Sequence, residues 1–121
     1  MRHSLVNAIV ECHDGDFFFH LVLTDDGRPV KMRLAGWWGK PDSTDVQPFI
    51  LKPDGRMDFG VAPDDDLEYL REGRYGTTDL LDRQVFVGRE VSIKVDDADY
   101  YLKVTTIEEL VGTGPKAKLP A

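Results

Sequence analysis

The sequence predicts a mainly β domain, an antiparallel meander that closes into a small barrel or sandwich of about seven strands, with one short helix near 64–73. Short segments in which apolar and polar residues alternate indicate strands, because side chains of a strand point to its two faces in turn. Turn-forming runs such as Asp14-Gly15 and Pro53-Asp54-Gly55 separate these segments at short intervals. Only the segment near 64–73 combines an acidic first turn, an apolar stripe and a terminal glycine, which together are typical of a helix.

The first two hairpins are expected at Asp14-Gly15 and Asp26-Gly27, because a tight hairpin turn favours residues that tolerate positive φ. Both turns align apolar residues on one face, so residues 4–35 are expected to form a three-stranded meander. The first turn places His13 opposite Asp16 and pairs Val10 with Phe19, Ala8 with Leu21, and Val6 with Leu23. The second turn pairs Leu23 with Val30, Leu21 with Met32, and Phe19 with Leu34.

Two further hairpins and a short turn follow along the chain. Pro53-Asp54-Gly55 predicts a three-residue loop with a bulge, which pairs Leu51 with Met57 and Phe49 with Phe59. Thr78 is expected to cap a short helical turn that begins at Asp79. A four-residue loop at 96–99 is expected to pair Val95 with Tyr100, Ile93 with Leu102, and Val91 with Val104. Residues 1–111 are therefore expected to form a single β domain, and residues 112–121 a flexible C-terminal tail.

Composition limits the classes of partner and cofactor. The chain of 121 residues has a formal net charge of −7 and a pI near 4.8, which disfavours binding to nucleic acid. The single cysteine, Cys12, and the absence of a recognisable signal segment predict a cytoplasmic protein, and no apolar stretch is long enough to cross a membrane. Neither the acidic runs nor Cys12 with the histidines match the spacing of a known metal site, so no metal and no cofactor are expected.

One candidate ligand site lies on the other face of the meander. In the predicted registers His20 lies between Ile9 and Arg33 as a direct neighbour of each. Glu11 faces Phe18 and lies diagonally from His20. A carboxylate, an imidazole and a guanidinium beside an aromatic ring are suited to binding a small anion or moving a proton. If this face turns inward, Glu11, Phe18, His20 and Arg33 line a barrel cavity. If it turns outward, they form an ordinary solvated surface.

A second group of residues is a candidate interface. Trp37 and Trp38 lie between Gly36 and Gly39, in a stretch expected to be a loop after the third strand, and Arg74 and Tyr75 belong to a glycine-punctuated stretch. Exposed aromatic and arginine side chains are enriched at protein interfaces, although one tryptophan could instead plug a barrel end. No catalytic motif is recognisable, so the first expectation is a non-catalytic binding or accessory module that contacts a protein partner or a second copy of itself. The alternative is a barrel that binds or transforms a small anionic ligand.

Overall fold

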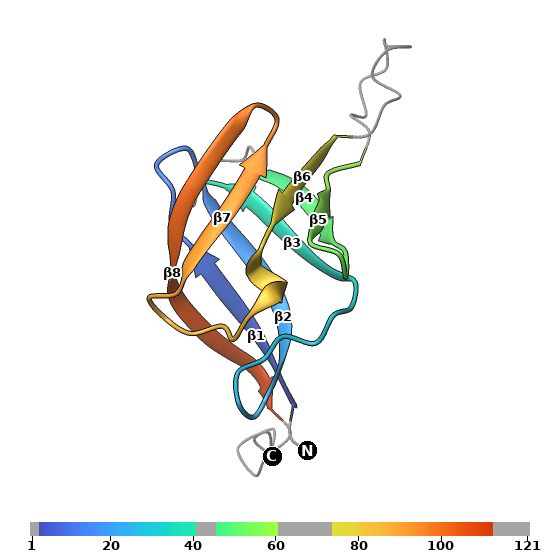
Figure 1. Ribbon diagram of the computed structural model, residues 1–121, viewed down its shortest axis with the longest axis vertical. Coiled ribbons are helices and arrows are strands. Elements are labelled where there is room, and N and C mark those ends of the chain that lie inside the picture. The colour runs from blue at the N-terminus through green and yellow to red at the C-terminus, as the bar shows by residue number, and fades with distance from the viewer. Residues whose placement is uncertain (1–2, 41–45, 61–73, 113–121) are drawn as a thin grey trace.

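The computed structural model describes residues 3–40, 46–60 and 74–112, and these residues form a closed antiparallel barrel (Figure 1). Each strand pairs with the next along the chain, and the last strand pairs with the first. The predicted β class is confirmed, and closure decides the question between barrel and sandwich. The elements are β1 (His3–Val10), β2 (Asp16–Thr24), β3 (Leu34–Gly39), β4 (Val46–Leu51), β5 (Arg56–Asp58), β6 (Tyr75–Thr78), the 3-10 helix η2 (Leu80–Asp82), β7 (Glu90–Val95) and β8 (Ala98–Gly112).

The barrel interior is filled by the apolar face that the sequence predicts. Alternate residues of β1 and β2 point inward, so that Ala8, Val10, Phe17 and Phe19 are fully buried. η2 adds Leu80 and Leu81 to the same core, and Leu80 N donates to Thr78 Oγ1 at 3.2 Å. A short helical turn therefore lies close to where the sequence predicts it, but its N-cap residue is Asp79 instead of Thr78. The predicted helix near 64–73 and all but the first residue of the predicted tail lie outside the described residues.

The first hairpin has the predicted faces but a different register. Val10 pairs with Phe17 and Ala8 with Phe19, so the prediction that paired Val10 with Phe19 is wrong by two residues. The cause is the position of the turn, which has His13 and Asp14 at its centre instead of Asp14 and Gly15. Gly15 N donates to the Cys12 carbonyl at 3.0 Å and Cys12 N donates to Asp16 Oδ1 at 3.1 Å. A shift of two residues keeps every side chain on its face, so the hydrophobic pattern cannot distinguish the two registers. Because of the same shift, three further predicted pairs are wrong: His13 with Asp16, Ala8 with Leu21, and Val6 with Leu23.

The second hairpin departs further from the prediction. Thr24 N donates to the Arg28 carbonyl and Leu23 bridges to Pro29, so the predicted pairing of Leu23 with Val30 is wrong by one residue. The chain then leaves the ladder at 31–33, and β3 re-enters with Phe19 opposite Gly36 instead of Leu34. The third strand therefore extends to Gly39, whereas the predicted meander ends at residue 35. The two tryptophans expected in a loop lie within β3.

The last two hairpins show how turn length sets register. The loop at Pro53-Asp54-Gly55 has the predicted three residues, with Gly55 at φ +91°, and Leu51 pairs with Met57 as predicted. At the β7–β8 hairpin the loop holds two residues instead of four, because Asp96 adopts φ +55°. Consequently Val95 pairs with Ala98, Ile93 with Tyr100, and Val91 with Leu102, which corrects the predicted pairs by two residues.

No helix among the described residues is long and apolar enough to cross a bilayer.

Candidate functional site

A row of apolar side chains crosses the outside of the barrel over four adjacent strands. Ile9 of β1 pairs with Phe18 of β2, Phe18 with Trp37 of β3, and Trp37 with Pro48 of β4. The rings of Phe18 and Trp37 stack with centroids 3.8 Å apart and planes inclined by 9°. Pro48 is exposed and the other three residues are half-buried, so this row faces solvent instead of the core.

Further apolar residues lie on one side of this row and extend the apolar surface. Ala35 pairs with Ile50 in the next row, and Leu5 pairs with both Val22 and Val111 in the row beyond it. Ile50 is 43% exposed and Val111 is 58% exposed. Asn7 and His20, which pair with each other, supply the polar positions between the rows. We call this surface the outer apolar face; it comprises Leu5, Ile9, Phe18, Val22, Ala35, Trp37, Pro48, Ile50 and Val111.

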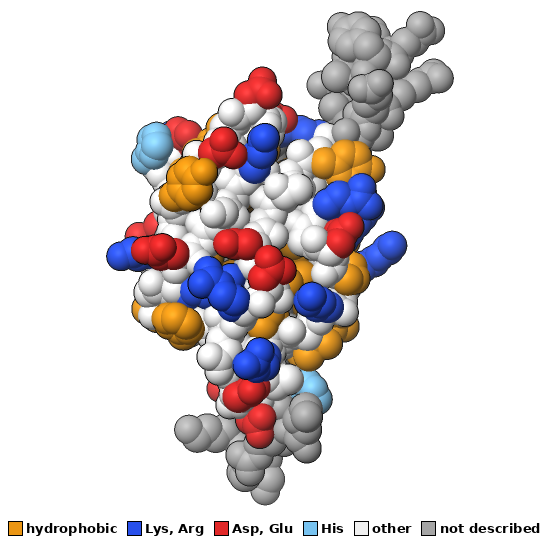
Figure 2. All heavy atoms as spheres, in the orientation of Figure 1, with side chains coloured by type: hydrophobic (Ala, Val, Ile, Leu, Met, Phe, Trp, Pro, Cys, Tyr) orange, Lys and Arg blue, Asp and Glu red, His pale blue; other side chains and the backbone are white. Residues whose placement is uncertain are grey.

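The opposite side of the barrel is polar. Its outward cross-strand pairs along β6, β7 and β8 include Thr77 with Lys94, and Glu90 with Lys103. Figure 2, viewed with β7 and β8 toward the reader, shows acidic and basic side chains interspersed over this side. Such mixed charge is the usual composition of a solvated sheet surface. The contrast between the two sides marks the outer apolar face as the unusual one.

The predicted ligand-site residues all lie outside the barrel interior. Glu11 and Arg33 were predicted within strands, but both are exposed in connections: Glu11 follows the end of β1 and Arg33 precedes β3. His20 is half-buried on the outer side of β2. His20 pairs with Asn7 instead of Ile9, and Phe18 pairs with Ile9 instead of Glu11. The registers that brought Glu11, His20 and Arg33 together are therefore wrong, and the inward-turned cavity that these residues were expected to line is filled by the apolar core. Their role in binding an anion stays a prediction.

The two tryptophans separate to opposite sides of the barrel wall. Trp37 belongs to the outer apolar face, whereas Trp38 is only 9% exposed and stacks on Phe17 with centroids 4.9 Å apart. The Trp38 indole Nε1 donates to the Gly15 carbonyl at 2.8 Å, which anchors the β1–β2 connection to the barrel. Of the two tryptophans, only Trp37 is placed where a partner could touch a large part of its ring.

Arg74 and Tyr75, the other predicted interface residues, lie at the start of β6. Arg74 forms a two-pronged ion pair with Asp96, in which Nη2 lies 2.7 Å from Oδ2 and Nε lies 3.1 Å from Oδ1. It also donates to Gln47 and lies over the Phe59 ring at 5.2 Å. The hydrogen bonds from Arg74 lower the pKa of the Asp96 carboxyl. Arg74 is thus committed to contacts within the chain, while Tyr75 remains 46% exposed.

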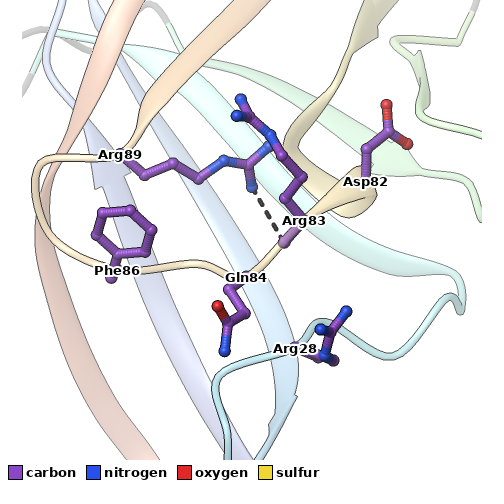
Figure 3. A pocket seen from close by; sticks show the side chains of 6 residues that line it. All are labelled: Arg28, Asp82, Arg83, Gln84, Phe86 and Arg89. Carbon is purple, nitrogen blue, oxygen red and sulfur yellow. Dashed lines mark hydrogen bonds between the residues drawn. The ribbon is translucent and has the colours of Figure 1, made fainter.

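A pocket beside η2 is built around a buried arginine (Figure 3). Arg89 is 3% exposed, and its guanidinium donates to the carbonyls of Leu80 at 2.6 Å and Asp79 at 2.7 Å. Burial, together with the neighbouring Arg83 guanidinium, lowers the pKa of Arg89. Figure 3 shows Arg89 reaching across the connection to the Arg83 carbonyl, while Arg28 points away from it. Arg83 and Arg89 both approach the Asp79 carboxylate, with Nη2–oxygen distances of 4.0 and 3.9 Å. Because these two charges already have a partner within the chain, the pocket is best explained by the fastening of η2 to the barrel.

Sequence reasoning missed the outer apolar face as a unit. The signal was present in β1 and β2, where apolar residues occupy both faces: Leu5 and Ile9 outward in β1, Phe18 and Val22 outward in β2. Strands that are apolar on both faces indicate a sheet covered on both sides. The comparisons add no further guide, since no protein-family model matches the chain and no curated protein or solved structure is significantly similar to it.

Proposed function

We propose that this protein is a non-catalytic binding module that pairs with a second copy of itself through the outer apolar face. The observation that supports this proposal is the stacked Phe18–Trp37 pair at the middle of an apolar row that faces solvent. Contiguous apolar patches on soluble proteins mark interaction surfaces, and aromatic residues supply much of the binding energy there.

The size of the face supports a weak and reversible association. Strand spacing and rise give the face a plan area of about 400 Å², from five strands and five residues along each. A standard stable interface buries about 800 Å² on each partner. Contact between two such faces therefore favours a dimer that forms at micromolar or higher concentration.

A second copy is the occupant that the distribution of charge favours. In a two-fold dimer the centre of the patch meets itself, so a charged residue there would face its own copy. The central polar positions are instead Asn7 and His20. Glu11 follows the end of β1, and Glu108 lies on β8 beside Asn7, its pairing partner. A centre without Lys, Arg, Asp or Glu allows the two identical faces to stack as the sheets of a sandwich do.

The net charge gives the association a distinctive salt dependence. Each copy carries a formal charge of −7, so two copies repel each other at low ionic strength. Salt shortens the screening length from about 10 Å at 0.1 M to about 3 Å at 1 M. The dimer is therefore expected to strengthen as salt is added, whereas binding to a basic partner would weaken.

Sedimentation equilibrium over a range of protein and salt concentrations tests the proposal. Trp37→Gln is expected to weaken the dimer about tenfold or more, the scale of an aromatic hot spot. Tyr101→Gln is the matched control, because Tyr101 is an aromatic residue 81% exposed on the polar side of the barrel. A protein that stays monomeric at millimolar concentration in high salt would contradict the proposal, as would an equal effect of both substitutions.

A further inference from the structure

The connection between β1 and β2 brings three side chains of metal-binding type together. Cys12, His13 and Asp14 each place one ligand atom so that all three atoms lie within 4.8 Å of one another. Cys12 is half-buried, while His13 and Asp14 are exposed. Consecutive residues match no familiar ligand spacing, which is why the sequence alone predicted no metal here.

The backbone of this connection is held in place before any ligand arrives. Gly15 N donates to the Cys12 carbonyl at 3.0 Å, and Cys12 N donates to Asp16 Oδ1 at 3.1 Å. The Gly15 carbonyl accepts the hydrogen bond from the buried Trp38 indole at 2.8 Å. A connection fixed at both ends loses less conformational entropy when its side chains converge on an ion.

The two exposed ligands already have a spacing that suits a tetrahedral ion. His13 Nε2 lies 3.3 Å from Asp14 Oδ1. Two ligand atoms at zinc–ligand distances of about 2.0–2.1 Å and a tetrahedral angle are themselves about 3.3 Å apart. The other carboxylate oxygen, Asp14 Oδ2, accepts a hydrogen bond from the Tyr100 hydroxyl at 3.1 Å, the kind of outer contact that orients a metal-binding carboxylate.

We propose that Cys12, His13 and Asp14 bind a zinc ion, with the fourth position open to water or an external ligand. A set of thiolate, imidazole and carboxylate ligands suits Zn²⁺ and is unsuited to Ca²⁺ or Mg²⁺, which prefer oxygen ligands alone. On binding, the Cys12 thiol gives up its proton to solvent and its sulfur bonds to the ion. Rotation of the exposed His13 and Asp14 side chains closes the remaining gap to the half-buried sulfur.

Cobalt(II) titration of the full chain under reducing conditions tests this site. Co²⁺ is a spectroscopic substitute for Zn²⁺, and a thiolate ligand gives it a near-ultraviolet charge-transfer band. We expect one equivalent of Co²⁺ to produce this band and one equivalent of Zn²⁺ to abolish it. Cys12→Ser should remove the band, and His13→Gln should weaken binding by more than about tenfold, since loss of even an outer contact costs that much.

His3→Gln is the matched control, because His3 begins β1 whereas His13 follows its end. This substitution is expected to leave the Co²⁺ affinity unchanged. A measurement that needs no variant is the alkylation rate of Cys12, which stoichiometric Zn²⁺ should slow at least tenfold. The proposal is overturned if no charge-transfer band forms, if the band survives in Cys12→Ser, if His13→Gln and His3→Gln bind alike, or if Zn²⁺ leaves the alkylation rate unchanged.

Discussion

Replacing Arg89 by methionine tests how strongly one buried cation fastens η2 to the barrel. Methionine keeps a long apolar side chain but removes the hydrogen bonds to the Leu80 and Asp79 carbonyls, which measure 2.6 and 2.7 Å. Hydrogen bonds from a charged group contribute about 1.5–3 kcal/mol each, so two amount to about 3–6 kcal/mol. Because the substitution also removes the cost of burying a charge, we expect a net loss of about 3 kcal/mol in the free energy of unfolding.

Chemical denaturation measures this change, with Arg83→Met as the control. The Arg83 side chain is 63% exposed and lies 4.0 Å from Asp79, so its loss should cost less than about 1 kcal/mol. Thermal unfolding should show a fall of about 10–15 °C for Arg89→Met. If Arg89→Met unfolds within error of the wild type, or no earlier than Arg83→Met, the hydrogen bonds do not stabilise η2 as reasoned.

Three further outcomes follow from contacts of single residues. Trp38→Phe should cost about 1 kcal/mol and speed amide exchange at Gly15, because the indole hydrogen bond is lost; unchanged exchange would contradict the anchoring role. Gly36→Ala should cost more than about 2 kcal/mol by denaturation, since its Cβ would lie 2.5 Å from a carbonyl oxygen of β2, and a neutral result would show that the strands can separate there. Asp96→Asn removes a carboxylate whose pKa is lowered by Arg74. The substitution should lower the free energy of unfolding by about 0.5 kcal/mol near neutral pH, after allowance for solvent exposure. This loss should vanish as the pH falls through the lowered pKa of Asp96, because the carboxylate is then protonated in the wild type as well. A loss that persists in acid would refute the ion pair as its cause.

The faces of the strands could be predicted from the sequence, but most registers could not. Val10 and Phe19 point inward as the alternation requires, yet they are not partners. Displacement by two residues leaves the hydrophobic pattern unchanged, so only the turn geometry distinguishes the registers. The hairpin that includes Pro53 was predicted correctly because proline and the following Asp54-Gly55 specify both turn type and loop length.

The outer apolar face could be predicted only in part, again because the strand registers could not be read from the sequence. Trp37 and Phe18 were each singled out from the sequence, but as members of different sites. Their stacking depends on the irregular segment 31–33, which sets where β3 joins β2 and carries no periodic pattern. The metal-type cluster depends on a turn whose hydrogen bonds fold three consecutive side chains toward one point, which a search by ligand spacing does not detect.

Closure of the barrel between β1 and β8 also bears on the speed of folding. This seam pairs Ser4 with Gly112 and Ala8 with Ile107, so it joins residues from opposite ends of the described chain. A pairing of such high contact order can form only after a large loss of chain entropy, and folding is expected to take milliseconds to seconds. Until the seam forms, β1 and β8 both present unpaired backbone. The interval before closure is therefore the stage at which the chain is most exposed to aggregation through its strand edges.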